Sequence, residues 1–419
     1  MVEHATIAAV FFLVYLGMIL GGLPFLQLDR TGIALLGAIA LVSLGAVTFE
    51  EALAAVHAPT LVLLFSFMVI SAQLRLGGFY GWVTWRLGHL PHAPPIFLAA
   101  LIAVTALIAA VFSNDIVCLA VAPVLIDVCR ARRLNPVPFL LALACAANVG
   151  SAATLIGNPQ NMLIGAALEL SFARYLAQAA PPVLFGLVAT WALIAWQARG
   201  RWEIAGARMG GSSATERVDP EPPFDVWQSA KGLTVAATVF GLFLAAPLPR
   251  EVIALIAAGV LMTSRKLHSR KMLGLVDWQL LVLFIGLFVV NHALQKTGLP
   301  QEVMRDLAAA GVDVTHPAPL FATAFVLSNI VSNVPAVMLL LPAASHDIAG
   351  PVLALSSTLA GNLFIVGSIA NIIVVDAAQR REIAIDWKTH ARVGIPVTLA
   401  TTAIAAAWLW AKAGPAAVS

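Results

Sequence analysis

Long apolar runs dominate this chain and leave few folds open to it. Runs such as Ala5–Gly22, Thr31–Ala46 and Tyr175–Gln197 approach or exceed the roughly 20 residues that a helix needs to cross the hydrocarbon core of a bilayer. Of the 419 residues, 60% are hydrophobic and only 11% are charged, and the mean hydropathy is +0.92. Water could not solvate the surface of such a chain, so we predict an all-α polytopic membrane protein.

The charged residues and the cysteines exclude several functions. In such a chain the positions of the basic residues indicate which loops face the cytoplasm, because lysine and arginine concentrate there. The net charge of +3 therefore gives no support for a nucleic-acid partner. Cys118, Cys129 and Cys145 lie in apolar segments, so we expect small buried residues rather than disulfides. The sequence has no phosphate-binding Gly-x-x-x-x-Gly-Lys-Ser/Thr loop, and neither a nucleophile with its base nor a set of paired metal ligands is apparent. We therefore expect no enzyme, no cofactor and no metal site.

Polar residues interrupt the apolar sequence at two neighbouring places. Ser113-Asn114-Asp115 joins the apolar legs Pro95–Phe112 and Ile116–Cys129, which are short for crossings, so we expect a re-entrant hairpin with its polar tip at mid-membrane depth. Farther on, Gly157-Asn158-Pro159-Gln160-Asn161 interrupts the run Val137–Leu168. Because Pro159 lacks a backbone donor and Gly157 permits non-helical dihedral angles, we predict a helix broken by these five residues. Such backbone survives in a membrane only where protein buries it or where it lines a wet cavity.

The second half of the chain repeats this pattern. Ser332-Asn333 follows an apolar leg as Ser113-Asn114 does, and each asparagine is followed nine residues later by a proline. Gly367-Ser368-Ile369-Ala370-Asn371 matches the first broken helix, because both motifs keep a glycine, a small polar residue and an asparagine at the same spacing. A further asparagine precedes each motif, Asn148 and Asn362, although these two spacings differ by about one helical turn.

The polar stretch 199–231 separates the two copies. It is rich in glycine, serine, proline and charge, which is typical of a linker. We expect residues 1–198 and 232–419 to form two inverted repeats, each with about five crossings, one re-entrant hairpin and one broken helix. If the linker is cytoplasmic, both termini lie outside. The outer loops then hold only five of the 24 basic residues, as the positive-inside rule requires.

Paired hairpins and broken helices would surround one cavity with half-helix ends and side-chain amides. Amides both donate and accept hydrogen bonds, which suits a substrate with several hydroxyl groups or oxygens. The predicted substrate site comprises Ser113, Asn114, Asn148, Gly157, Asn158, Asn161, Ser332, Asn333, Asn362, Gly367, Ser368 and Asn371. The alternative is that the asparagines only satisfy backbone groups at the helix breaks.

Asp115 is the sharpest clue to energy coupling. An ionisable side chain at mid-membrane depth is costly, so a relay or coupling-ion site is its default interpretation, the alternative being a cap on the second leg of the hairpin. The equivalent position in the second copy is Val334, so the turn itself does not require the acid. Asp376 is a second candidate for proton binding, although the basic residues from Arg380 onward indicate a helix end near water.

The motifs resemble those of the ion transporter superfamily. The resemblance rests on Ser113-Asn114-Asp115 with Pro123, on Asn148-Val149-Gly150-Ser151 and on Ile156-Gly157-Asn158-Pro159-Gln160-Asn161, and it points to the arsenite and antimonite efflux permeases and the plant silicon efflux transporters. It implies a secondary transporter with a scaffold and a moving, elevator-type substrate domain, and it is compatible with a homodimer. Relatives in the divalent-anion/sodium symporter branch carry Ser-Asn-Thr at both hairpin tips, where it helps to bind sodium. Asp115 and Val334 replace that threonine here, which favours protons.

We therefore predict a proton-coupled antiporter of the inner (cytoplasmic) membrane that exports a small uncharged oxyacid such as silicic or arsenous acid. The exporters that the chain resembles carry small hydroxylated acids, and that class agrees with motifs rich in amides and free of arginine. The first alternative is a sodium-coupled carrier of a dicarboxylate, sulfate or another small anion. A passive channel is an alternative of another class. The expected partners are the oxyacid and the lipid bilayer.

Overall fold

The computed structural model describes residues 2–22, 26–89, 93–203 and 223–413. Within these ranges the ordered elements are helices, and the only strand-type pairing is an isolated bridge between Leu134 and Glu203. This confirms the predicted all-α class.

Ten of the described helices precede residue 198. They are α1 (Val2–Leu20), α2 (Arg30–Ser43), α3 (Phe49–Ala55), α4 (Ala58–Leu76), α5 (Phe79–Gly88), α6 (Pro94–Phe112), α7 (Asn114–Ala131), α8 (Pro136–Ser151), α9 (Pro159–Ala167) and α10 (Phe172–Gln197).

Ten more described helices follow. They are α11 (Val226–Ala245), α12 (Arg250–Met262), α13 (Ser269–Leu273), α14 (Trp278–Lys296), α15 (Leu299–Ala309), α16 (Pro317–Val331), α17 (Asn333–Leu340), α18 (Ala349–Ala360), α19 (Ile369–Gln379) and α20 (Trp387–Ala413). Two short 3₁₀ turns, Leu341–Ala343 and Ile365–Gly367, lie after α17 and before α19.

Polar side chains cap several of these helices, which explains where the apolar runs become helical. Asp29 accepts a hydrogen bond from the backbone N–H of Gly32 at the start of α2, and Asp277 accepts one from Leu280 at the start of α14. Asp225 does the same for Gln228. Because of this last cap, α11 begins at Val226. The final six residues of the expected linker 199–231 are therefore helical. Residues 204–222 of that linker lie outside the described ranges.

Many helix–helix contacts of the first half recur between the helices of the second half whose numbers are larger by ten, with α11–α20 in turn corresponding to α1–α10. α2 packs on α14 as α12 packs on α4, and α6 packs on α8 as α16 packs on α18. α7 contacts α19, and α17 contacts α9. Several helices whose numbers differ by ten therefore have equivalent packing partners.

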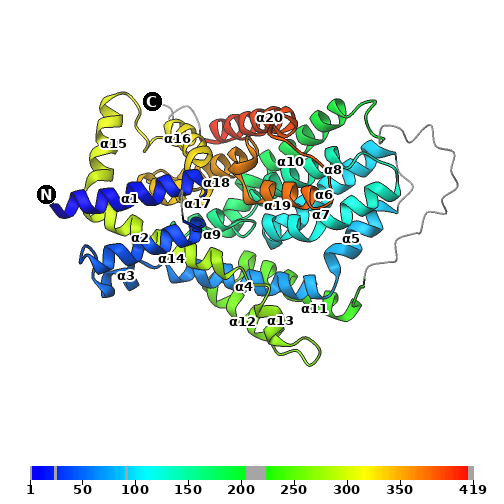
Figure 1. The fold of residues 1–419 in the computed structure, drawn as a ribbon, viewed down its shortest axis with the longest axis horizontal. Coiled ribbons are helices and arrows are strands. Elements are labelled where there is room, and N and C mark those ends of the chain that lie inside the picture. Colours follow the sequence, from blue (N-terminus) through cyan, green and yellow to red (C-terminus); the bar gives the residue numbers. More distant parts are fainter. Residues whose placement is uncertain (1, 23–25, 90–92, 204–222, 414–419) are drawn as a thin grey trace.

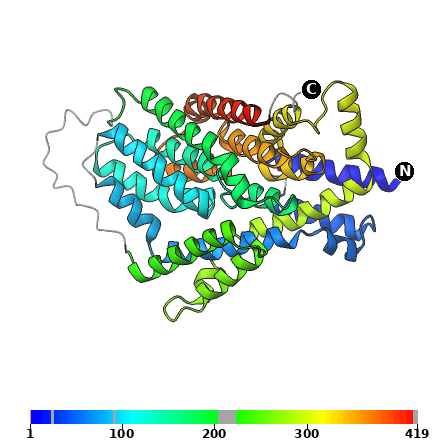
Figure 2. The same cartoon turned by 180° about the vertical axis from the view of Figure 1, so that it is seen from behind.

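The helices form two groups. The α4 group comprises α1, α2, α4, α11, α12 and α14, and the α8 group comprises α6 to α10 and α16 to α20. α20 lies on the edge opposite α4, α11 and α12 in both views (Figures 1 and 2). Contacts between the groups are uneven, because α9 packs against α4 whereas its equivalent α19 has no comparable packing against α14 in the described part of the chain.

Six of the described helices are long and apolar enough to cross a bilayer, namely α4, α6, α10, α11, α14 and α20. α6 contains 19 residues, so the expectation that the first hairpin leg is too short to cross is wrong. Its helix starts at Pro94 and nothing interrupts it before Ser113. Helices α8, α16, α18 and α19 are apolar but shorter.

Candidate functional site

The first broken helix changes direction between α8 and α9. α8 ends at Ser151 and α9 begins at Pro159, so the break covers residues 152–158 and shares only Gly157 and Asn158 with the five residues that the sequence indicates. Proline is well tolerated at the first position of a helix, where its missing N–H has no intrahelical partner. A Cβ atom on Gly157 would lie 2.2 Å from the backbone oxygen of Ser151, so only glycine fits there without a backbone shift.

The two Ser-Asn tips share an unusual backbone conformation. Ser113 has φ 66° and Ser332 has φ 78°, a region that non-glycine residues seldom adopt. The backbone N–H of Asn114 donates to the oxygen of Gly157 at 3.1 Å, which holds the first tip against the first break. A Cβ built on Gly361 would lie 3.2 Å from Asn333 Nδ2, so the second tip lies against the second break.

Asn161 and Asn371 close the two breaks in the same way. Asn161 Nδ2 donates to Thr154 O at 2.9 Å and to Ser151 O at 3.5 Å, seven and ten residues earlier. Asn371 Nδ2 donates to Phe364 O at 3.0 Å and to Gly361 O at 2.8 Å, at the same two offsets. This alignment pairs Asn148 with Thr358, so the sequence-based pairing of Asn148 with Asn362 is wrong by one helical turn.

Asn148 on α8 connects the two halves. Its Oδ1 accepts from Asn114 Nδ2 at 2.8 Å and from Ser368 Oγ at 2.9 Å. Its Nδ2 donates to Asn362 Oδ1 at 2.8 Å and to Asn371 Oδ1 at 3.2 Å. One side chain therefore joins five of the predicted site residues, including itself, around one point between α7, α8 and α19.

Thr358 makes the equivalent connection from α18. Its Oγ1 accepts from Asn158 Nδ2 at 3.3 Å and from Gln160 Nε2 at 3.2 Å, and it donates to Asn161 Oδ1 at 3.4 Å. Sequence reasoning missed Thr358, although it stands as far before Asn371 as Asn148 stands before Asn161. A search for polar residues at that offset, rather than for asparagines, would have found it.

Two backbone carbonyls fix the orientation of the amides around Asn148. The Nδ2 group of Asn371 must face the backbone oxygens of Gly361 and Phe364, because a carbonyl can only accept. The Oδ1 atom of Asn371 therefore faces Asn148, and Asn148 must donate to it from Nδ2. Asn148 Oδ1 then requires a donor from Asn114, which leaves Asn114 Oδ1 without a partner. By the same reasoning Asn362 is left with an unpartnered Nδ2.

Some of the buried atoms without a hydrogen-bond partner lie on residues bonded to Asn148, and others lie at the two Ser-Asn tips. They include Asn114 Oδ1, Asp115 Oδ1, Asn333 Oδ1 and Asn362 Nδ2. In contrast, Asn158 and Asn161 use both side-chain atoms within the protein, since Asn158 Oδ1 also accepts from the backbone N–H of Asn161 at 2.9 Å. The alternative role of satisfying broken backbone describes Asn161 and Asn371 well. Gly367 packs closely, because a Cβ there would lie 3.1 Å from Gly361 O.

The two candidate proton-binding residues lie in different surroundings. Asp115 is in the first turn of α7, half-buried, and its carboxyl group faces the backbone N–H of Ala370 in the first turn of α19. Its equivalent Val334 is buried. Asp376 is exposed and forms an ion pair with Arg380 at 2.8 Å, so it belongs to the end of α19 and not to the cluster. Cys118, Cys129 and Cys145 are buried free thiols.

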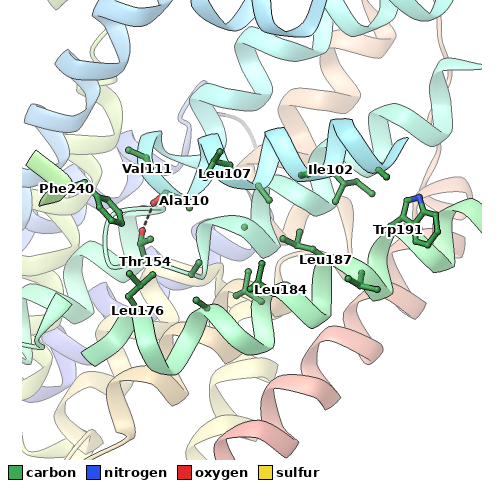
Figure 3. Close-up of a pocket in the computed structure, with 18 residues that line it drawn as sticks. Ile102, Leu107, Ala110, Val111, Thr154, Leu176, Leu184, Leu187, Trp191 and Phe240 are labelled. Atoms are coloured by element: carbon green, nitrogen blue, oxygen red, sulfur yellow. Dashed lines mark hydrogen bonds between the residues drawn. The ribbon is translucent and has the colours of Figure 1, made fainter. Parts of the chain in front are cut away.

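A large apolar groove lies on another face, between α6, α8 and α10 with Phe240 of α11 at one end (Figure 3). Its volume is about 760 Å³, and Leu107, Leu184 and Val188 on its walls are exposed. Thr154 contributes the hydroxyl group on this wall and donates it to Ala110 O. A groove of this composition offers an oxygen-rich solute few hydrogen-bond partners.

Known proteins identify the family. A family model described as a citrate transporter (CitMHS) matches residues 15–351, more than half of the chain. The chain belongs to the citrate transporter family. This places the transporter in the ion transporter superfamily, as the hairpin and broken-helix motifs predict.

Relatives of similar length support this assignment. The transporter is 31% identical over 412 residues to the 46 kDa membrane protein of Mycobacterium leprae, and the match covers 92% of this chain and 94% of the relative. It is 29% identical over 448 residues to the silicon efflux transporter LSI3 of Oryza sativa subsp. japonica, with 91% and 92% covered. The solved YdaH transporter of Alcanivorax borkumensis shares the fold with a TM-score of 0.56 at 14% identity, covering 99% of each chain. The protein is therefore a multi-pass membrane transporter, and nothing in its family or relatives indicates an enzyme.

Proposed function

We propose that this transporter is a proton-coupled antiporter that exports a small uncharged oxyacid of the silicic or arsenous acid type. The observation that carries the proposal is the set of unpartnered buried atoms on Asn114, Asp115, Asn333 and Asn362, three oxygens and one N–H₂ group. A ligand with several O–H groups donates to the oxygens and accepts from the amide. Hydroxylated acids that keep their protons have this pattern, whereas a fully ionised anion offers acceptors only.

The charge around the site also favours a neutral substrate. Within the described part of the chain, the side chains bonded to Asn148 and Thr358 are amides and hydroxyls, and no lysine or arginine is among them. Citrate, another carboxylate or sulfate would more naturally bind to arginine or lysine. The N-terminal ends of α7 and α19 supply partial positive charge, which suits hydroxyl oxygens without requiring an anion.

Asp115 is the proposed proton carrier. An ionised carboxylate in a membrane requires a partner, and Asp115 forms no ion pair among the described residues. Proton binding removes its charge and converts one oxygen into a donor for the substrate. Because Val334 replaces it in the second half, one such residue serves the whole site. Against sodium coupling, the alternative, stands the resemblance already described, because Asp115 and Val334 replace the threonine that helps to bind sodium at the two hairpin tips of the symporters.

The repeated packing supports alternating access between two states. We infer that helices α1–α10 and α11–α20 are inverted repeats, with a cytoplasmic linker and both termini outside. In the present arrangement α9 packs on α4, whereas α19 has no comparable packing on α14 among the described residues. Exchanging these contacts would move the α8 group relative to the α4 group and open the site to the other side. The name of the rice relative supports the direction of export.

Ligand-induced stabilisation would test the substrate class. Purified transporter is heated with silicic acid, arsenous acid, citrate or sulfate, with and without sodium. We expect the neutral acids to raise the unfolding temperature, and the shift to be lost in Asn114→Leu but kept in Asn291→Leu, a buried asparagine on α14 whose side chain bonds to Tyr15 and to the oxygen of Leu287. Stabilisation by citrate or sulfate that requires sodium would instead support the anion carrier. A channel is excluded if reconstituted protein accumulates substrate against its gradient.

A further inference from the structure

His390 on α20 occupies the position that Tyr175 occupies on α10. Each is the fourth residue of its helix, and each contacts the carbonyl oxygen at the start of the neighbouring break. Tyr175 Oη donates to Ala152 O at 2.8 Å, and His390 Nε2 lies 3.1 Å from Asn362 O. No motif in the sequence links these two residues, so the equivalence is visible only in the fold.

The contact determines which nitrogen of His390 carries a proton. A backbone carbonyl can only accept, so Nε2 must hold the hydrogen, and Nδ1 of the neutral ring is a bare, buried acceptor without a partner. His390 is 2% exposed. A Cβ atom on Gly394 would lie 2.4 Å from Asn362 O and 2.9 Å from His390 Nε2, so glycine at this position allows the break to approach α20.

The two anchored residues differ in what they present to the site. Ala152 has no polar side chain, and the one amide that Tyr175 contacts is Asn161, whose Nδ2 donates to Tyr175 Oη at 3.2 Å and which has no unpartnered side-chain atom. Asn362 has an amide whose Oδ1 accepts from Asn148 and whose Nδ2 is the unpartnered donor of the site. An anchor on the Asn362 carbonyl therefore also sets where that amide points.

We propose that His390 is a positioning residue for the substrate-binding amide of Asn362. Its neutral imidazole donates from Nε2 to the Asn362 carbonyl and so holds the amide toward the substrate, while Asn148 holds it from the other side. This inference rests on the proposed transport function. Tyr175, by contrast, holds Ala152 O and the Asn161 amide, neither of which has an unpartnered atom to offer the substrate.

Three variants separate positioning from simple stabilisation. His390→Phe removes the donor, His390→Gln keeps an N–H₂ group near the place of Nε2, and Tyr175→Phe removes the equivalent donor in the first half. The KM and maximal rate of substrate flux are measured in proteoliposomes, and the unfolding temperature of each variant is measured in detergent. We expect the KM of His390→Phe to rise about tenfold, that of His390→Gln to stay within about threefold, and Tyr175→Phe to lower the unfolding temperature at unchanged KM.

Two results would overturn the positioning role. One is an unchanged KM in His390→Phe with a loss of stability like that of Tyr175→Phe. The other is a ¹⁵N spectrum of the histidine-labelled wild type. The signal of His390 is the one that is absent from the spectrum of His390→Gln, and the positioning role fails if this signal shows a proton on Nδ1 rather than on Nε2. If the wild type moves no oxyacid, the proposed substrate class fails, and the same variants are compared on the solute that it does move.

Discussion

Asn161 and Asn371 each donate their side-chain N–H₂ group to two backbone carbonyls, seven and ten residues earlier in the chain. The two breaks are therefore closed by the same device. The two asparagines differ in the hydrogen-bond donor to their side-chain oxygen. Asn161 Oδ1 accepts from Thr358 Oγ1, whereas Asn371 Oδ1 accepts from Asn148 Nδ2. Only the second contact belongs to the group that holds the unpartnered atoms.

Alanine substitution at these two positions should have a shared effect and a separate one. Asn161→Ala and Asn371→Ala each leave buried carbonyl groups unpaired, at a cost of about 1–3 kcal/mol per group, so both should lower the unfolding temperature. Asn371→Ala also frees Asn148 to turn, so it alone should weaken substrate binding. Binding measured by ligand-induced thermal shift checks this. Equal loss of binding in both variants would show that the site extends over both breaks.

Gly157 should tolerate no side chain. Because a Cβ atom there would lie 2.2 Å from Ser151 O, Gly157→Ala should displace the break and destabilise the protein strongly. Gly241 in α11 is the matched control, since nothing lies within 4 Å of a Cβ built there. Gly241→Ala should stabilise the helix by about 0.5–1 kcal/mol. Thermal unfolding of the two variants compares them directly. A stable Gly157→Ala protein would mean that the break relaxes easily.

Arg250 holds α9 to the α4 group. Its Nη2 donates to Gly165 O at 2.6 Å, and Arg30 stands at the equivalent first position of α2 without a hydrogen bond in the described part of the chain. Arg250→Met should lower the unfolding temperature and change the maximal transport rate more than the KM, because the bond links the groups that must move. Arg30→Met should leave the unfolding temperature unchanged. Similar losses in both variants would contradict a contact specific to this arrangement.

Glu51 predicts a pH dependence of stability outside the membrane-spanning helices. A hydrogen bond from the Lys296 ammonium group, with a further one from the backbone N–H of Thr48, lowers the pKa of Glu51 from 4.5 to about 2. Because the folded-state pKa is the lower one, the contribution is complete above about pH 4.5 and fades as the pH falls toward about 2. Glu51→Gln should therefore be less stable than wild type at neutral pH, by a small amount because the pair is exposed, and the difference should vanish in acid. Parallel unfolding curves over that pH range measure it, and a gap that widens in acid would reverse the sign.

Local sequence signals predicted the elements of this site better than their pairing. Ser113, Asn114, Gly157 and Asn158 stand out because polar and glycine residues are rare in apolar runs, and the structure brings them to the helix breaks. Thr358 was missed because a threonine in an apolar helix is common and bonds equally well to its own backbone.

Contacts between distant segments were not readable from the sequence. Tyr175 and His390 reach their carbonyls from separate helices, so no local spacing shows the contact. The sequence pairs Asn148 with Asn362 because both residues are asparagine. The structural equivalent of Asn148 is instead Thr358, which lies one helical turn before Asn362. The start of α11 at Val226 was also missed, since its cap Asp225 lies in a stretch whose composition is that of a linker.

Flux of silicic or arsenous acid through proteoliposomes under an imposed pH gradient is the sharpest test of proton coupling through Asp115. We expect the gradient to drive uphill movement in wild type, Asp115→Asn to move substrate only downhill, and Val334→Ala, at the equivalent position, to keep the response. Equal flux with and without the gradient, or unchanged coupling in Asp115→Asn, would contradict proton coupling through Asp115.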